Sequence, residues 1–388
     1  MKTKRTPSAD LETIMPILLG VWRRFQKEGG PKDRLQTREF RQVVEGVKLL
    51  QNVEKNIETE DYFQDKNLLG SYLLYNFVVN YQQGLSLIGE LPTPPRRVLD
   101  ICSGPGAFAI AALRHGADEV IATDQNMAAL KMAADISARY GLSITTRQWN
   151  PLKGRIPVEG KFDLITLGHS LEELFPNSQK GWPQAQQKFI HMLLNLLTPN
   201  GYLMLVESSQ PESNRRLLEL RDYLVEQGVP VQAPCVFKGS CPALKTPNSP
   251  CYAQRQFQKP YLIRELQRGA DIMLGSLKFS YVIFKNPSAG WSELPEGHLY
   301  RIVSPPIEIH QTKRFYLCGT EGKKILESRL KMFTPETKAF DYLKRGELVS
   351  IVDADEKLNI FDINENSKLK VIAACGKPVP SIHDLTEY

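Results

Sequence analysis

The spacing of apolar residues changes near residue 92 and divides the chain into a helical part and a mixed part. Apolar residues recur at intervals of three and four over Leu11–Lys27, Arg38–Asn52 and Asn67–Ile88, which predicts three helices. The proline-rich segment Pro92–Pro95 ends the last helix. We therefore expect residues 1–92 to form a helical N-terminal region.

After Arg96, short apolar runs alternate with helical stretches. The runs of strand length are Val98–Ile101, Glu119–Thr123, Ser143–Gln148, Phe162–Leu167 and Tyr202–Val206. The helical stretches are Ala107–Arg114, Ala128–Tyr140, Ala185–Leu197 and Glu212–Glu226. Such alternation is typical of βαβ units, so we predict an α/β fold with a Rossmann-like, mostly parallel sheet. The run KFSYVIF at Lys278–Phe284 predicts a late strand of this sheet.

Short strands and polar turns follow from about Tyr300, with one helix expected near Pro335–Lys344. The expected late strands are Leu348–Val352, Leu358–Asp362 and Lys370–Ala374. A small β-barrel or sandwich fits this pattern. We therefore predict three regions: a helical one at 1–92, an α/β domain at 93–290 with a cysteine-rich insertion at 231–277, and a β-rich region at 291–388.

The composition predicts a folded globular protein without a transmembrane helix. Hydrophobic residues make up 42% and charged residues 24%, as in ordinary globular proteins. No stretch approaches about 18 uncharged apolar residues, and the N-terminus lacks the apolar segment of a signal peptide. The 49 basic and 43 acidic residues give a net charge of +6, which permits an anionic partner such as RNA without requiring one. We expect a monomer.

A glycine-containing loop joins the first predicted strand to the following helix. Its sequence is DICSGPG, from Asp100 to Gly106. Gly104 and Gly106 let a ligand approach the backbone, and a helix N-terminus suits a carboxylate or a phosphate. Asp124 ends the second strand, where a carboxylate can accept both hydroxyls of a ribose. These residues predict a nucleotide-type site, although an ordinary strand-to-helix turn is the alternative.

This loop resembles motif I of the class I S-adenosylmethionine methyltransferases, with Cys102 in the place of the first loop glycine. The resemblance covers about residues 96–206. It implies an S-adenosylmethionine site formed by Asp100, Cys102, Ser103, Gly104 and Gly106. By the same resemblance, Asp124 binds the ribose with Gln125 or Asn126 beside it, Asn150 contacts the adenine edge, and His169 faces the methyl group. The alternatives are a plain loop residue at Asn150 and a structural histidine at His169.

The catalytic residue is not identified by the sequence. The N/D-P-P-Y/F run of base N-methylating enzymes is absent after the fourth strand, where the chain reads GHSLEE. No cysteine in the fourth or fifth strand can serve as a nucleophile for pyrimidine C5 methylation. His169 and Glu172 are hypothetical bases, and transfer by positioning alone is a further option. A cofactor-binding protein without turnover also fits.

Three cysteines gather in a loop rich in proline and glycine. Cys235, Cys241 and Cys251 have the spacing C-x5-C-x9-C, which packing alone does not explain. Thiolates in such a loop suit zinc or an iron–sulfur cluster, and free thiols are the remaining alternative. The candidates for a fourth ligand are Cys318, Cys375, Cys102 and His310.

Several segments in order resemble the methyltransferase-like family of small-ribosomal-subunit assembly proteins, known on the mitochondrial ribosome and with bacterial relatives. The segments are VLDICSGPG, LVESSQPESNRRLLELR, APC-x5-CP-x8-C, KFSYVIF, YRIVSPP and FYLCGTEGK. They span about Val98 to Lys323. The resemblance implies a 4Fe-4S cluster, with zinc as the alternative, held by Cys235, Cys241, Cys251 and Cys318. It also implies the small ribosomal subunit or its rRNA as the partner.

Basic and aromatic residues interleave between Tyr252 and Lys285, a mixture that can bind phosphates and stack on bases. The basic residues are Arg255, Lys259, Arg264, Arg268, Lys278 and Lys285, and the aromatic ones are Phe257, Tyr261, Phe279, Tyr281 and Phe284. Arg215, Arg216 and Arg221 on the preceding helix extend the expected patch. A solvated charged face over an apolar strand is the alternative.

We interpret the chain as an S-adenosylmethionine-dependent methyltransferase-like protein with a 4Fe-4S cluster, acting on the small ribosomal subunit or its rRNA. One alternative is a non-catalytic assembly or RNA-binding factor with the same fold. A weaker alternative is a small-molecule methyltransferase with a structural zinc. We expect no DNA and no membrane partner, and a cytoplasmic location, or the mitochondrial matrix if the chain is eukaryotic.

Overall fold

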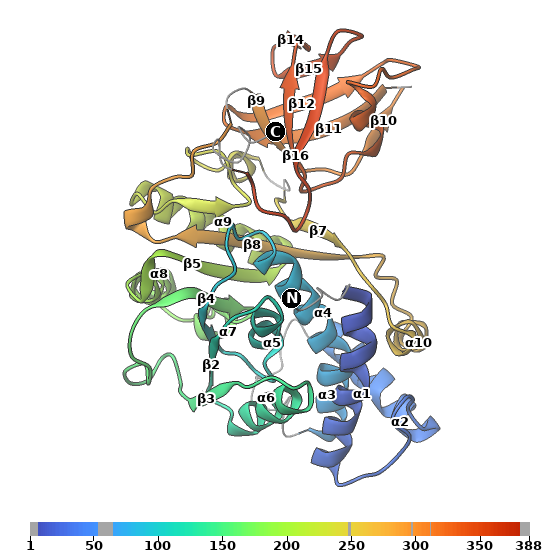
Figure 1. Cartoon of the computed structure of the whole chain (residues 1–388), viewed down its shortest axis with the longest axis vertical. Helices are drawn as coiled ribbons and strands as arrows, with labels where there is room; N and C mark the ends of the chain where they lie inside the picture. The colour runs from blue at the N-terminus through green and yellow to red at the C-terminus, as the bar shows by residue number, and fades with distance from the viewer. Residues whose placement is uncertain (1–6, 53–64, 247–249, 296–297, 311, 381–388) are drawn as a thin grey trace.

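The computed structural model describes residues 7–52, 65–246, 250–295, 298–310 and 312–380. Its centre is a sheet in the order β3-β2-β1-β4-β5-β8-β6, with β7 paired along β8 (Figure 1). The strands are β1 (Arg97–Ile101), β2 (Glu119–Asp124), β3 (Thr145–Gln148), β4 (Phe162–Gly168), β5 (Leu197–Ser208), β6 (Val231–Ala233), β7 (Ala253–Gln256) and β8 (Ser276–Lys285).

The first five strands are parallel, and β8 is antiparallel to β5, β6 and β7. In β1, Val98 packs into the core on one face of the sheet and Leu99 into the core on the other, which explains the continuous apolar run. The strand order reverses between β1 and β4, and ligands of such sheets bind beside this point at the carboxyl ends of the strands. The predicted Rossmann-like fold class is confirmed.

Helices cover both faces of the sheet. One face carries α1 (Pro7–Gln26), α2 (Thr37–Asn52), α3 (Lys66–Ser71), α4 (Phe77–Ile88), α5 (Ala107–Arg114), α6 (Met127–Arg139) and α10 (Tyr261–Ala270). The other face carries α7 (Leu171–Leu174), α8 (Trp182–Leu194) and α9 (Pro211–Glu226). No helix within the described stretches combines the length and the apolar character needed to span a bilayer.

The third predicted helix is interrupted. Between α3 and α4 the chain forms a π-helical turn, η2 (Tyr72–Asn76). The spacing of apolar residues did not reveal this turn, because it predicts a helix over Asn67–Ile88 without distinguishing its hydrogen-bond pattern. Such turns are frequent at functional sites.

The cysteine-rich insertion contains more regular structure than the sequence analysis expected. Strands β6 and β7 extend the sheet, and helix α10 lies against α2. The signal for α10 is the spacing of Leu262, Ile263, Leu266 and Ala270, all buried. The basic residues Arg264 and Arg268 interrupt that spacing and are typical of a solvated or RNA-binding segment as well.

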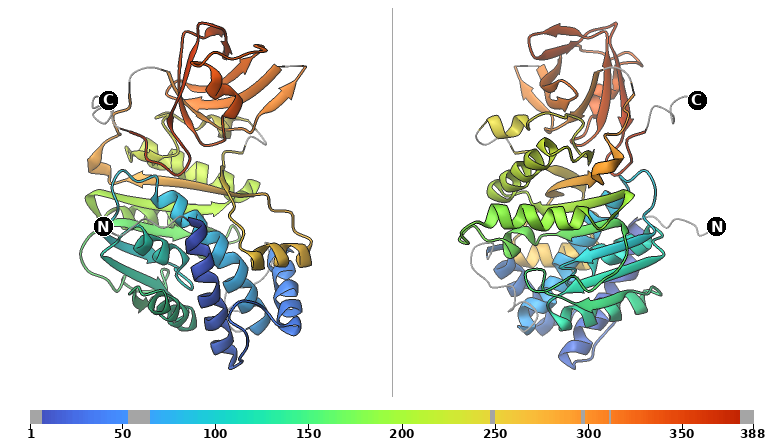
Figure 2. Two further views of the ribbon diagram at one scale, coloured as in Figure 1. Left: turned by 45° about the vertical axis from the view of Figure 1, so that its right-hand side comes forward. Right: turned by 90° about the vertical axis from the view of Figure 1, so that its left-hand side faces the viewer.

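The C-terminal region is a second sheet, in the order β14-β15-β12-β11-β9-β13-β16 with β10 paired to β11. Its strands are β9 (His298–Ile302), β10 (Ile307–Ile309), β11 (Thr312–Gly319), β12 (Gly322–Ser328), β13 (Leu348–Val352), β14 (Asp355–Lys357), β15 (Ile360–Ile363) and β16 (Lys368–Ala373). The helix expected near Pro335–Lys344 is a short 3-10 turn at Lys338–Tyr342. Figure 2 shows this region stacked beyond β8 and α9, away from α1–α3.

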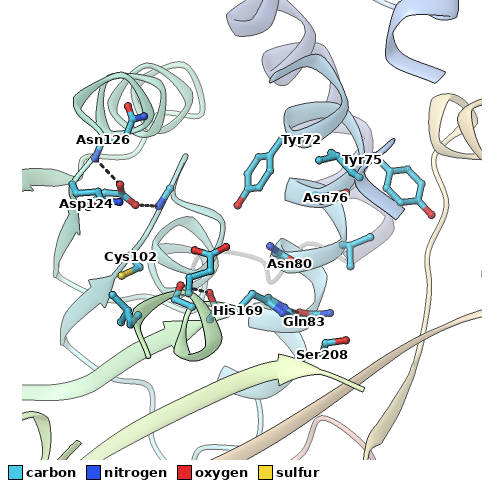
Figure 3. A pocket seen from close by; sticks show the side chains of 18 of the residues that line it. Tyr72, Tyr75, Asn76, Asn80, Gln83, Cys102, Asp124, Asn126, His169 and Ser208 are labelled. Carbon is cyan, nitrogen blue, oxygen red and sulfur yellow. Dashed lines mark hydrogen bonds between the residues drawn. The ribbon is translucent and has the colours of Figure 1, made fainter. Parts of the chain in front are cut away.

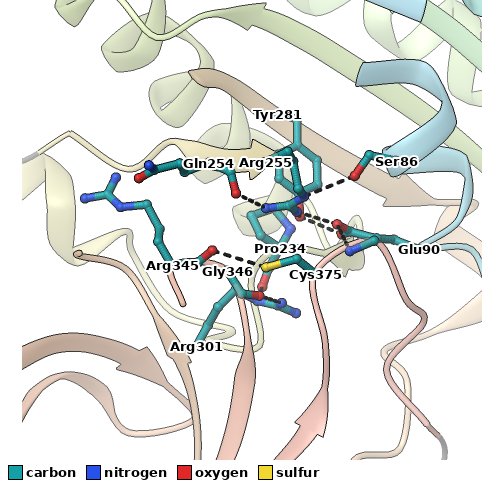
Figure 4. Close-up of polar contacts among 11 residues, drawn as sticks. Ser86, Glu90, Pro234, Gln254, Arg255, Tyr281, Arg301, Arg345, Gly346 and Cys375 are labelled. Atoms are coloured by element: carbon teal, nitrogen blue, oxygen red, sulfur yellow. Dashed lines mark hydrogen bonds and ion pairs between the residues drawn. The ribbon is translucent and has the colours of Figure 1, made fainter. Parts of the chain in front are cut away.

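A buried ion pair joins the three parts of the chain (Figure 4). Arg255 of β7 pairs with Glu90, which follows α4, and both side chains are about 5% exposed. The hydroxyl of Tyr281 in β8 donates to Glu90 at 2.6 Å, and the Gly376 amide donates to the same carboxylate at 3.3 Å. Burial and the Glu90 charge act in opposite directions, and the carboxylate prevails, raising the pKa of Arg255.

Replacement of Arg255 by Met should destabilise the protein, because it leaves the Glu90 charge buried without a cation. We expect the free energy of unfolding, measured by urea denaturation, to fall by about 3–5 kcal/mol. Arg96→Ala is the matched control. Its partner Asp118 and Arg96 itself are exposed, so the loss there should stay within about 1 kcal/mol. Equal losses in the two variants would contradict the structural role assigned to Arg255.

Candidate functional site

A large cavity opens at the carboxyl ends of β1, β2 and β4, between the glycine loop and the N-terminal helices (Figure 3). Its volume is about 1030 Å³. That is the upper end of the range for pockets that take a drug-sized ligand, so it exceeds what one nucleoside-sized molecule needs. The predicted site residues that line it are Cys102, Gly104, Asp124, Gln125, Asn126, Asn150 and His169.

Asp100 lies beneath the glycine loop and does not appear among the described residues that line the cavity. Its carboxylate accepts hydrogen bonds from the Ser103 hydroxyl at 2.6 Å, the Thr166 hydroxyl at 2.6 Å and the Ala109 amide at 3.1 Å. Burial raises the pKa of Asp100 to about 6, although these three bonds act in the opposite direction. Asp100 therefore ties the loop to β4 and to the start of α5.

Asp124 connects the loop to the second strand. One carboxylate oxygen accepts from the Gly104 amide at 2.8 Å, and the other accepts from the Asn126 amide at 2.8 Å. Asn126 in turn caps α6 by accepting from the amides of Ala128 and Ala129. A carboxylate has about four acceptor positions, so Asp124 can still accept a hydrogen bond from a ligand.

The glycine loop has a left-handed backbone at three positions. Gly104 and Gly106 have φ values of 53° and 89°, which glycine adopts without strain. Cys102 has φ 52°, so its β-carbon occupies a conformation that favours glycine. A β-carbon at Gly106 would also lie 3.0 Å from that of Ala133 in α6, so the absence of a side chain at Gly106 allows α5 and α6 to pack closely.

Gln125 and Asn150 face each other across the ends of β2 and β3. The Asn150 amide donates to the Gln125 side-chain oxygen at 2.8 Å, and its own oxygen accepts from the Leu152 amide at 2.9 Å. Two of the predicted adenosine-binding residues are therefore adjacent, and their orientations are fixed.

His169 and the acidic residues after it lie at the end of β4. The His169 ring nitrogen Nε2 lies 2.8 Å from the side-chain oxygen of Gln83 in α4. Burial lowers the pKa of His169 to about 4, so the ring is neutral at pH 7. Glu173, and not the expected Glu172, lines the cavity among the described residues. Although Glu173 is an exposed residue, desolvation at the cavity wall, with the Asp124 and Glu172 carboxylates nearby, raises its pKa to about 7.

The N-terminal helices supply a wall of the cavity that the sequence analysis did not identify. Its residues are Tyr72, Tyr75, Asn76, Asn80 and Gln83. The signal in the sequence is a row of polar residues within an otherwise apolar helix. Only the folded chain shows that this row faces the strand ends.

Four cysteines gather where the C-terminal sheet meets the α/β domain. Cys235 follows β6, Cys241 precedes a 3-10 turn, Cys251 precedes β7, and Cys318 lies in β11. Burial and the charges of the other three raise the pKa of Cys251 well above its ordinary value. Burial with Cys235 and Cys241 raises the pKa of Cys318 to about 12. The four sulfurs are therefore close enough to interact electrostatically.

Arginines surround these thiols. Arg221, Arg301 and Arg345 each lower the pKa of at least one of the four cysteines against the effect of burial. Arg301 also donates to the Pro234 carbonyl at 2.6 Å, which fixes the cysteine loop to the C-terminal sheet. Within the described part of the chain, no three His, Cys, Asp or Glu side chains form a group that could hold a metal ion.

The other candidates for a fourth ligand lie elsewhere. The Cys375 thiol donates to the Arg345 carbonyl at 3.2 Å, and Cys102 lines the cavity. His310 is exposed in the turn between β10 and β11.

Half of the residues expected to bind RNA lie in the interior of the protein, and the expectation is wrong for these residues. The buried members are Arg255, Phe257, Phe279, Tyr281, Phe284, Arg216 and Arg221. They cannot stack on bases or reach phosphates, because the apolar residues complete the core and the arginines bond inside the protein. The members that stay exposed are Tyr261, Arg264, Arg268, Lys278 and Arg215.

Glu207 at the end of β5 is a buried carboxylate. It accepts hydrogen bonds from the amides of Ser170 and Leu171 at 3.2 and 2.9 Å. Burial raises the pKa of Glu207 to about 8 despite these bonds, with the Glu172 and Glu173 charges acting in the same direction. The native state therefore favours the protonated form near neutral pH.

Comparison with known proteins gives one family and many structures. Residues 90–334 match the family described as "Mitochondrial small ribosomal subunit Rsm22", which is more than half of the chain. No curated protein matches the chain.

The solved structures include several methyltransferases. The N-methyltransferase NodS from Bradyrhizobium japonicum WM9, in complex with S-adenosyl-L-homocysteine, is 15% identical over 62% of this chain and 98% of its own, with a TM-score of 0.36. Magnesium protoporphyrin IX methyltransferase from Synechocystis PCC 6803 is 13% identical over 62% and 97%, with a TM-score of 0.37. The ribosomal protein L11 methylase from Lactobacillus delbrueckii is 24% identical over 40% and 69%, with a TM-score of 0.30. At these scores the overlap carries no argument, and the fold assignment depends on the strand order.

Glu207 makes stability depend on pH. A raised carboxyl pKa stabilises the protein fully below the ordinary value near 4.5, and this contribution is lost as the pH rises through about 8. Glu207→Gln keeps an acceptor oxygen but cannot ionise. In chemical denaturation from pH 5 to 9, we expect the wild type to lose stability relative to this variant by a few kcal/mol. Parallel curves for the two proteins would contradict the assignment.

Proposed function

Because the chain belongs to the Rsm22 family of the mitochondrial small ribosomal subunit, we propose that it binds S-adenosylmethionine in the cavity and acts on that subunit or its RNA. The observation that carries the proposal is the hydrogen bond between the Gly104 amide and the Asp124 carboxylate at the ends of β1 and β2. It fixes a carboxylate beside a left-handed loop and the start of α5. This arrangement suits the ribose and the charged amino-acid part of one ligand.

Different residues of the cavity then bind different parts of the cofactor. Asp124 binds the ribose hydroxyls, and the adjacent Gln125 and Asn150 contact the adenine. The backbone at Cys102 and Gly104 faces the amino-acid part. Asp100, Ser103 and Gly106 act from outside the cavity, because they shape the loop and the start of α5.

Bound S-adenosylmethionine supplies an electrophilic methyl group. The chain's own part is to orient the acceptor and to remove its proton. Glu173 is better suited to proton removal than Glu172, because it lines the cavity and its pKa of about 7 lets it accept a proton near neutral pH. His169 stays neutral and is held by Gln83, which suits a positioning role.

A second candidate is a cofactor-binding assembly factor without turnover. The left-handed Cys102, whose side chain lines the cavity where a glycine would leave space, favours it. A methylation assay on small-subunit RNA with radiolabelled S-adenosylmethionine separates the two candidates. Stable incorporation of label supports the enzyme, and binding without incorporation supports the factor.

We further propose that Cys235, Cys241, Cys251 and Cys318 hold a 4Fe-4S cluster. The donor set fits, since such clusters take four cysteine thiolates, one on each iron, and therefore do not require the ligands to meet around one ion. This distinguishes the cluster from zinc, which needs four ligands around a single centre. The surrounding arginines offset the negative charge that the thiolates bring into a buried place.

The family description supports a proposal for the partner and the compartment. It names a mitochondrial small ribosomal subunit, and we propose the rRNA of such a subunit as the contact. Location in the mitochondrial matrix remains a prediction for this chain, as does the monomeric state.

Asp124→Ala should abolish the cofactor site while leaving the sheet intact. The variant loses the ribose acceptor, the hydrogen bond to the Gly104 amide of the loop and the hydrogen bond to the Asn126 amide at the start of α6. Isothermal titration with S-adenosyl-L-homocysteine should show at least a tenfold loss of affinity, which is about 1.4 kcal/mol. Asp118→Ala removes an exposed acid of the same domain and should bind as the wild type does. Unchanged affinity in Asp124→Ala would disprove the proposed cofactor site.

Cys241→Ser should remove the cluster, because loss of one thiolate lowers the affinity for iron and metal binding contributes to folding. We expect the visible absorbance and the iron content of anaerobically purified protein to fall together with the melting temperature. Cys375→Ser is the control, since that thiol bonds to the Arg345 carbonyl and a hydroxyl can do the same. Stoichiometric zinc and no iron in the wild type would support the zinc alternative instead.

A further inference from the structure

One wall of the cavity is polar without an evident structural reason. Tyr72, Asn76, Asn80 and Gln83 follow one another at helical spacing along η2 and α4, and all four line the cavity. Their neighbours Phe77 and Val78 are fully buried in the core, so the polar row is confined to the face that meets the cavity. Figure 3 shows Tyr72, Asn80 and Gln83 extending from the helices toward the strand ends that carry Asp124 and His169.

The two asparagines differ from the other polar residues of this wall. Gln83 is engaged by His169, and the Tyr75 hydroxyl accepts from Gln267 at 3.1 Å. Within the described residues, the Asn76 and Asn80 side chains have no hydrogen-bond partner and are only partly exposed. Both carboxamides line the cavity, so their donors and acceptors are available to a ligand that enters it.

The chemistry of the wall matches a nucleobase. A carboxamide carries a donor and an acceptor side by side, which complements the edge of a base, and the Tyr72 ring offers a flat surface for stacking. Lys278 is the one Lys or Arg side chain among the described lining residues, and it is exposed, as a phosphate contact must be. The cavity also has room for a base beside a bound cofactor.

We propose that Asn76 and Asn80 bind the edge of an unstacked nucleobase of single-stranded or locally opened RNA, with Lys278 contacting the adjoining phosphate. The proposal rests on the proposed function, because it identifies the acceptor side of the same cavity. It explains why the N-terminal helices close over the sheet domain. A base that enters this cavity must first leave its stack, as in other enzymes that act on bases.

The test uses the full-length protein saturated with S-adenosyl-L-homocysteine and fluorescein-labelled ten-nucleotide RNAs of only A, only C or only U. Anisotropy should show a preference for one of the three. In Asn80→Leu and Asn76→Leu, which keep the side-chain size and suit a helix, we expect that preference to fall by about tenfold. Lys278→Ala should weaken all three RNAs alike and reduce the salt dependence of binding.

Controls separate this proposal from the proposed function. Asn359→Ala, exposed in the C-terminal sheet, should leave RNA binding unchanged. The affinity for S-adenosyl-L-homocysteine, measured on the same samples, should stay within twofold in the asparagine variants, which also shows that they fold. If that affinity holds while both asparagine variants keep the wild-type preference, the nucleobase proposal is overturned and the cofactor site stands. Absence of any base preference in the wild type overturns it too.

Discussion

The cavity depends on one buried carboxylate, that of Asp100. Its hydrogen bonds reach the loop at Ser103, the start of α5 at Ala109 and the neighbouring strand at Thr166. Three segments that meet at the reversal point of the sheet are thus held by a single side chain. Asp124 then accepts from the Gly104 amide of a loop that Asp100 already holds in place. The two acids of the motif therefore have different roles. Asp100 holds the loop from below, and Asp124 remains available to a ligand.

Sequence pattern predicted the sheet domain well, because its strands are buried on both faces and its helices are amphipathic. Strand Val98–Ile101 and helix Ala107–Arg114 lie within a residue of their observed bounds. Helix α10 was not predicted, because Arg264 and Arg268 made the segment resemble an RNA-binding stretch. The residues of the glycine loop could be assigned from spacing, whereas Asn76, Asn80 and Glu173 could not, since their approach to the site depends on how distant elements pack.

The C-terminal sheet is attached through polar groups that leave little freedom. Arg301 reaches the Pro234 carbonyl, Glu90 receives the Gly376 amide, and Leu299 packs with Val236 from the cysteine loop. The thiols of that loop therefore lie at a junction, with Cys318 contributed from the far side. Buried charges at such a junction favour one relative placement of the two sheets over others, because a displaced arginine or carboxylate would lose its partners without reaching water.

Strand β8 pairs with β5, β6 and β7, yet it follows all three in the chain. During synthesis on a ribosome, the edge of β5 therefore stays open until about residue 285 has emerged, and β6 has no neighbour to pair with before then. Open strand edges recruit other chains. A nascent or truncated chain that ends before β8 is thus an aggregation hazard, and the cell must shield it until the sheet closes.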